Sequence, residues 1–111
     1  MKNPLAPKPP SRLSAEARDW WRKLVEGYSI ADEAGLLLLA TGLEAFDRMR
    51  EAQRCIKKDG ATFRDRFGQI RANPATTIER DSRAGMMAAL KALNLDIEPL
   101  HDRPGRPSGS R

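Results

Sequence analysis

The chain of 111 residues contains a single cysteine, Cys55, and a single histidine, His101. One cysteine cannot form a disulfide within the chain, and such low usage is typical of a reducing compartment. A lone cysteine and a lone histidine also cannot supply a zinc ligand set or a Cys/His nucleophile pair. We therefore expect no metal site and no bound cofactor.

Phosphate-binding glycine loops are absent as well, since neither GxxxxGK[ST] nor GxGxxG occurs in the sequence. Acidic residues are frequent, but they alternate with arginine and lysine as they do on solvated helix faces. In "ERDSR" at 79–83, for example, Glu79 and Arg83 have the spacing of an i,i+4 ion pair on a helix. The sequence predicts a protein that is not an enzyme.

Long hydrophobic runs are absent too. The most apolar stretch, "LLLLATGL" at 36–43, is far too short to cross a bilayer, and Met1 is followed by "KNPLAPKPP" rather than by an apolar leader. We expect a soluble cytoplasmic protein with no membrane contact. Aromatic residues amount to only 5% of the chain, which predicts a thin core. Subunits with thin cores often gain stability by oligomerising.

The net charge of +5 is concentrated outside the expected helices. Basic residues in excess occupy the start of the chain, the stretch "GATFRDRFGQIRANP" at 60–74 and the end: Lys2, Lys8, Arg12, Arg64, Arg66, Arg71, Arg103, Arg106 and Arg111. Such a distribution is compatible with a polyanionic partner.

Proline, capping residues and apolar periodicity predict a mainly α fold with three helices. We expect an extended, proline-rich basic arm over residues 1–13, a helical core domain over 14–95 and a flexible basic tail over 96–111. Within the core, Ser14 caps the first helix and a second, long helix runs from near Asp32 to Gly60. Asn73 and Pro74 start the third helix.

A small β-hairpin is predicted at about 61–71, between the second and third helices. A turn around 65–68, with Gly68 at a positive-φ position, pairs Arg64 with Gln69 and Phe63 with Ile70. Because an isolated hairpin is marginally stable in water, we expect the Phe63–Ile70 face to pack on the helices. Arg64 and Arg71 then point outward, and Phe67 at the turn could contact a neighbouring molecule.

The second and third helices have more apolar and small residues than one subunit needs to cover. The expected oligomer interface comprises Leu36, Leu37, Leu43, Ser82, Gly85 and Ala89. Head-to-tail contacts either close or continue as filaments, so we expect a homo-oligomer in the form of a closed ring.

Three stretches in this order and spacing resemble the small subunit of the terminase of tailed bacteriophages. They are "PPSRLSAEARDWWRKLVEGY", "EAFDRMREA" and "DGATFRDRFGQIRANPATTIERDSRAGMMAALKALNLD", which together span most of residues 9–99. The resemblance implies a non-catalytic factor of viral DNA packaging in the bacterial host cell, which assembles into a ring. It also implies two partners, double-stranded viral DNA and the large terminase subunit, whose ATPase and nuclease it regulates.

The sequence departs from this family in one respect. Many of its members carry a separate helix-turn-helix domain for DNA, whereas only the proline-rich arm precedes the first helix here. We therefore assign DNA contact to Arg64, Arg66 and Arg71, helped by Lys8 and Arg12. Two other functions remain open: a prophage-encoded basic helical DNA-binding regulator without a terminase partner, and a helical protein-interaction module.

Overall fold

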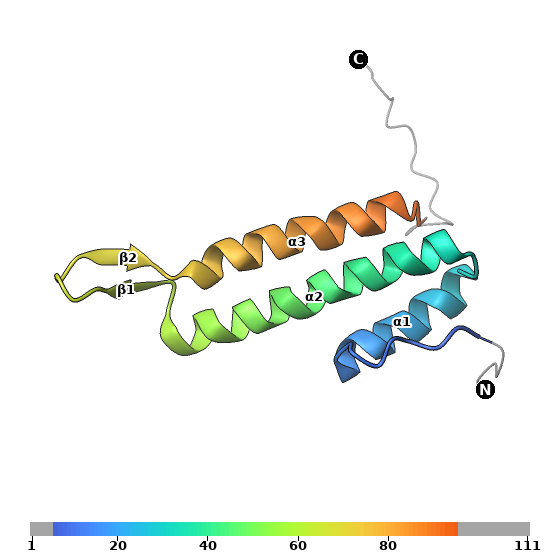
Figure 1. Cartoon of the computed structure of the whole chain (residues 1–111), viewed down its shortest axis with the longest axis horizontal. Helices are drawn as coiled ribbons and strands as arrows, with labels where there is room; N and C mark the ends of the chain where they lie inside the picture. The colour runs from blue at the N-terminus through green and yellow to red at the C-terminus, as the bar shows by residue number, and fades with distance from the viewer. Residues whose placement is uncertain (1–5, 96–111) are drawn as a thin grey trace, which may run out of the picture.

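The computed structural model describes residues 6–95, so the predicted tail over 96–111 and the first five residues lie outside the described part. Three helices carry a two-stranded antiparallel hairpin between the second and the third (Figure 1). The elements are α1 (Ala15–Tyr28), α2 (Glu33–Asp59), β1 (Thr62–Arg64), β2 (Ile70–Ala72) and α3 (Pro74–Ala92). This order confirms the mainly α fold predicted from the sequence.

The helices begin and end at residues that satisfy exposed backbone groups. Ser14, Asp32 and Asn73 precede α1, α2 and α3, and each side chain accepts a hydrogen bond from a backbone N–H two or three residues further on. Gly60 ends α2 with φ of 89°, and Asn94 takes a left-handed conformation with φ of 58° just after α3. Local sequence therefore sets the helix boundaries.

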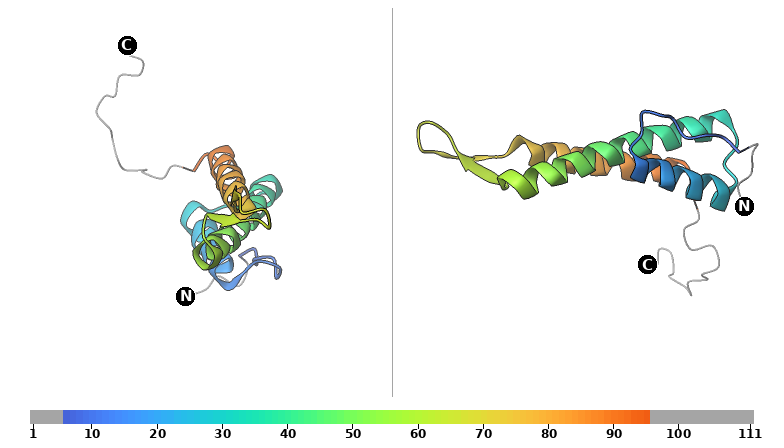
Figure 2. Two further views of the ribbon diagram at one scale, coloured as in Figure 1. Left: turned by 90° about the vertical axis from the view of Figure 1, so that its left-hand side faces the viewer. Right: turned by 90° about the horizontal axis from the view of Figure 1, so that it is seen from below.

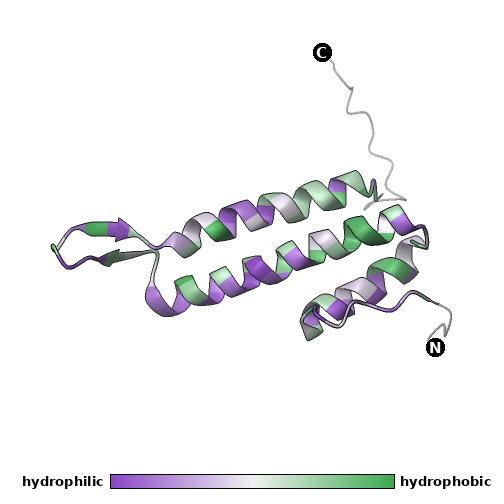
Figure 3. Cartoon of the chain, in the orientation of Figure 1, coloured by the Kyte–Doolittle hydropathy of each residue, from purple (hydrophilic) through white to green (hydrophobic). Residues whose placement is uncertain are grey.

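Helix α2 is the central element, at roughly 40 Å long for its 27 residues. It packs against α3 along its length and against α1 over its first half (Figures 1 and 2). The core lies where all three meet, and Figure 3 shows hydrophobic positions concentrated there. The buried members of this core are Leu13, Ala17, Trp21, Val25, Ile30, Leu39, Ala40, Leu43, Phe46 and Met49.

Small residues allow α2 and α3 to approach each other closely. A Cβ added at Gly42 of α2 would lie 3.0 Å from the Cβ of Ala89 on α3, and one added at Gly85 of α3 would lie 3.8 Å from the Cβ of Ala45. The first distance is shorter than most Cβ contacts, so glycine at position 42 allows this crossing without a shift of α3. The small-residue face of α3 thus packs on α2 of the same chain.

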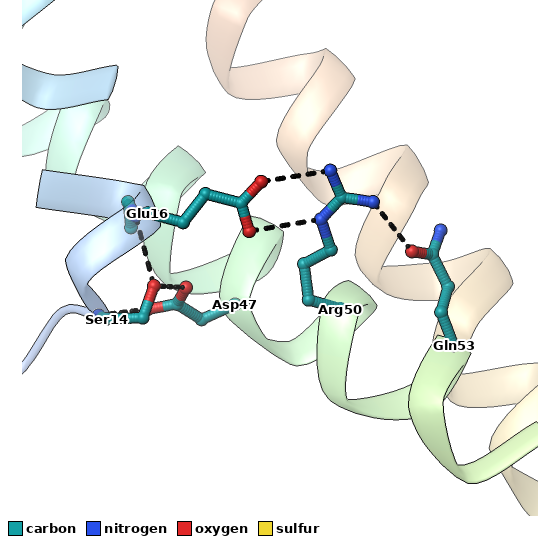
Figure 4. A network of polar contacts seen from close by, with 6 residues as sticks. Ser14, Glu16, Asp47, Arg50 and Gln53 are labelled. Carbon is teal, nitrogen blue, oxygen red and sulfur yellow. Dashed lines mark hydrogen bonds and ion pairs between the residues drawn. The ribbon is translucent and has the colours of Figure 1, made fainter. Parts of the chain in front are cut away.

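A polar network attaches the start of α1 to the middle of α2 (Figure 4). Asp47 accepts hydrogen bonds from both the backbone N and the Oγ of Ser14, at 2.9 and 2.5 Å. Arg50 donates to both carboxylate oxygens of Glu16, at 3.3 and 3.0 Å. These contacts hold the N-terminal end of α1 against α2, at the point where the hydrophobic packing of α1 begins.

The same network continues to α3. Arg50 donates to Gln53, which donates to Glu79 at 3.1 Å, and Glu79 also pairs with Arg83. These contacts lower the pKa of Glu79, the hydrogen bond from Gln53 first and Arg83 after it, while partial burial opposes the shift. Glu79 and Arg83 form the helical ion pair expected from their spacing. No helix in the described part of the chain is long and apolar enough to cross a membrane.

Candidate nucleic-acid interface

The hairpin projects beyond the ends of α2 and α3, away from α1 (Figure 1 and the right view of Figure 2). Its base is fixed by Asn73, which is only 8% exposed. The backbone N of Asn73 donates to the oxygen of Ala61, and its side-chain amide donates to the oxygen of Gly60, both at 2.8 Å. The hairpin therefore leaves the helices from a fixed base where α2 ends and α3 begins.

The strand register differs by one residue from the predicted register. Phe63 pairs with Arg71, and Arg64 pairs with Ile70. The reason lies in the turn: Gly68, with φ of 79°, donates its N–H to the oxygen of Asp65 at 2.9 Å. The N of Asp65 also donates to the oxygen of Gln69, so the loop comprises the three residues 66–68 rather than four, as in hairpins that close with a type I turn and a left-handed residue.

This shift places Phe63 and Ile70 on opposite faces of the hairpin, because side chains alternate along a strand. Phe63 is 46% exposed and Ile70 is 64% exposed, and every residue of both strands is exposed. The expectation that a Phe63–Ile70 face packs on the helices is therefore wrong. The hairpin is stabilised by its turn and its base instead.

Asp65 stabilises the turn. Its carboxylate accepts hydrogen bonds from the backbone N of Phe67 at 2.8 Å and of Gln69 at 3.0 Å, and from Nε of Arg71 at 2.9 Å. These donors favour the charged carboxylate, so the pKa of Asp65 is lowered, with Arg71 the largest cause. One side chain thus joins the loop to β2.

The three hairpin arginines are all exposed, but they differ in their partners, and Arg64 and Arg71 lie on opposite faces of the hairpin. Arg71 forms an ion pair with Asp65. Arg64 donates to the backbone oxygen of Gly68 at 2.7 Å, and the guanidinium of Arg66 lies 5.3 Å from the ring centre of Phe67. Within residues 6–95, neither Arg64 nor Arg66 is ion-paired with a carboxylate, so the tip of the hairpin carries two uncompensated positive charges.

The structure separates the arm residues from this cluster. The arm segment that carries Lys8 and Arg12 lies beside α1, apart from the hairpin (Figure 1). Arg12 forms an ion pair with Glu44 in the middle of α2, whereas Lys8 is exposed. The five predicted DNA-contacting residues therefore form two groups, three on the hairpin and two on the arm.

Phe67 was not among the predicted DNA-contacting residues, yet it is the most exposed large hydrophobic side chain of the described chain, at 73%. It lies at the loop of the hairpin, between Arg66 and Gly68. The sequence indicated this exposure only through the position of Phe67 in a turn, where no other part of the hairpin can bury its side chain. An apolar side chain exposed in this way is commonly part of a contact surface.

The predicted oligomer interface divides by burial. Leu43, Ser82 and Ala89 are buried within the single chain, and Leu36 packs partly on its core. Leu37 is 69% exposed and Gly85 is exposed. The interface remains a prediction that now rests on the last two residues and on other exposed apolar residues such as Ile78.

The residues placed in the structure include no group of three or more His, Cys, Asp or Glu side chains that could hold a metal ion. The candidate interface is thus a pair of unpaired guanidinium groups beside an exposed aromatic ring. Guanidinium groups bind phosphate oxygens, and aromatic rings stack on bases.

Residues 17–99 match the family model described as the small subunit of phage terminase. The match covers most of the chain and all three helices as well as the hairpin. The chain belongs to the phage terminase small-subunit family, and this membership supports a role in packaging phage DNA. No curated protein and no solved structure matches the chain significantly.

Proposed function

We propose that this protein is a non-catalytic DNA-packaging factor that binds double-stranded viral DNA through its hairpin and regulates the large terminase subunit. The observation that supports DNA contact most strongly is the pair Arg64 and Arg66, exposed on a projecting hairpin without a carboxylate partner among the described residues. Family membership supports the packaging role and the two partners.

Contacts of arginine to phosphate position a protein on DNA without reading its sequence, and they weaken steeply as salt rises. In a homo-oligomer every subunit repeats the same two arginines. A weak contact in each subunit then becomes a strong total through multivalency. We propose a ring-shaped homo-oligomer for this reason, with the hairpins presented together. Lys8 and Arg12 can add contact at a separate position.

The proposal is tested by substituting Arg64→Ala and Arg66→Ala together. Arg71 is left in place because it stabilises the turn through Asp65. The variant should bind duplex DNA more weakly, and the slope of log K against log salt should fall by about one for each phosphate that the protein no longer neutralises.

The matched control is Arg22→Ala with Arg80→Ala, which removes the same charge from exposed ion pairs on α1 and α3. Binding should change much less in the control than in the hairpin variant. Equal losses of affinity in both would show that only net charge matters, and an unchanged hairpin variant would remove the hairpin from the interface.

A further inference from the structure

The tip of the hairpin holds Phe67 outward on a rigid support. The backbone N of Phe67 donates to the carboxylate of Asp65 at 2.8 Å, and the left-handed Gly68 closes the turn behind it. The turn is closed by a second bond as well, from the N of Asp65 to the oxygen of Gln69 at 2.9 Å. The backbone that carries the ring is thus hydrogen-bonded on both sides, while the ring itself is 73% exposed.

Positive charges flank the ring. The guanidinium of Arg66 lies 5.3 Å from the ring centre, and Arg64 reaches the backbone oxygen of Gly68, the residue after Phe67. An exposed apolar group between two cations is unfavourable as a docking point for an apolar or basic protein surface. It is well matched to a surface that offers phosphates on both sides of an apolar stack.

We propose that Phe67 inserts as a wedge between adjacent base pairs of double-stranded DNA, while Arg64 and Arg66 bind the flanking phosphates. This inference rests on the proposed DNA-binding function and adds a deforming contact to it. Proteins that bend DNA use apolar side chains in this manner, and the cost of unstacking a step is offset by the additional protein surface that the bent duplex contacts. The rigid turn reduces the ordering cost of presenting the ring.

The contact requires no base-specific hydrogen bond. Its sequence preference would follow the ease of unstacking, which is greatest at pyrimidine–purine steps such as TA. A wedge of this kind gives the protein a preference for deformable sites that the arginines alone cannot supply, because phosphates are the same in every sequence.

The test uses the full chain and a 30-bp duplex, about three helical turns long, with 2-aminopurine at a central TA step. This base fluoresces more strongly when it is unstacked. The wild-type protein should raise the fluorescence on binding. Phe67→Ala should abolish that rise and bind about 5- to 10-fold more weakly, in line with the removal of one stacked aromatic ring. Phe67→Trp should restore both.

Trp20→Ala is the matched control, because Trp20 is a partly exposed aromatic on α1, far from the hairpin. It should leave the fluorescence rise and the affinity unchanged. A rise that persists in Phe67→Ala, or wild-type binding without any rise, would overturn the wedge while leaving phosphate contact intact. Loss of binding to the large subunit with full DNA unstacking in Phe67→Ala would assign the ring to a protein partner and also overturn it. Wild-type binding that does not depend on Arg64 and Arg66 would instead contradict the hairpin interface itself.

Discussion

At the scale of single residues, Asp65 determines the shape of the hairpin more than any apolar side chain does. Its carboxylate connects the loop backbone to Arg71, and Arg71 is consequently the least available of the three hairpin arginines. The sequence predicted the hairpin and the positive φ of Gly68. It did not predict the register, because the same sequence is compatible with a three-residue and with a four-residue loop. Only the hydrogen bonds that the Asp65 carboxylate accepts from the loop backbone distinguish the two.

The lowered pKa of Asp65 predicts how the hairpin responds to acid. The folded pKa lies below the ordinary value of 3.8, chiefly because Arg71 donates to the carboxylate and next because the backbone of Gln69 does. The stabilisation is therefore complete above about pH 3.8 and is lost as the pH falls through the lowered folded value. NMR amide shifts of Phe67 and Gln69, followed from pH 6 to about pH 2, should report this transition below 3.8.

Asp65→Asn is the control for this titration, because its amide cannot ionise. It should remove the pH-dependent shift and leave at most a neutral hydrogen bond from Arg71 at every pH. A carboxyl that titrates at or above 3.8, or an Asn variant that retains the acid transition, would show that Asp65 does not hold the turn.

At the scale of elements, the helix boundaries followed from local chemistry, because caps such as Ser14, Asn73 and Gly60 act within a few residues. The packing of the hairpin could not be predicted in this way, because the local sequence does not determine whether an apolar face of a strand will be buried by the helices. The small residues of α3 were predicted to contact another subunit, but Ser82 and Ala89 are buried against α2 instead. Helical spacing shows which face of a helix is made of small residues, but it does not show which helix packs against that face.

Two exposed apolar residues, Leu37 on α2 and Ile78 on α3, predict the oligomer contact. Leu37 is 69% exposed and Ile78 is 49% exposed. Helical spacing of 100° per residue places Ile78, seven residues before Gly85, on the side of α3 where Gly85 meets Ala45. Leu37→Glu with Ile78→Glu should reduce the particle to a single subunit of 12.4 kDa, measured by light scattering coupled to size exclusion.

Met87 supplies the control for that experiment. It is 57% exposed, and it lies nine residues after Ile78, on the opposite side of α3. Met87→Glu should leave the assembly intact. A wild-type monomer at micromolar concentration would contradict the oligomer, and dissociation by Met87→Glu alone would place the contact on the other side of α3.

At the scale of the whole molecule, the helices act as a support that holds the hairpin far from α1 and from the arm. The polar network runs from Glu16 through Arg50 to Gln53 (Figure 4) and from there to Glu79, and it links all three helices, so the hairpin base stands on a connected scaffold. The sequence indicated which segments carry the excess charge. Only the structure showed that the hairpin group lies apart from the arm group, because that separation depends on the length and direction of α2.

Site-specific photo-crosslinking to DNA tests the central claim most directly. A photoreactive phenylalanine analogue is placed at position 67, on the hairpin tip, or at position 20, on the exposed side of α1, and the protein is irradiated with radiolabelled duplex DNA at low and at high salt. We expect a DNA adduct from position 67 at low salt, its disappearance at high salt, and little or no adduct from position 20. A strong adduct from position 20 with none from position 67 would contradict it and would place the DNA on the helical body.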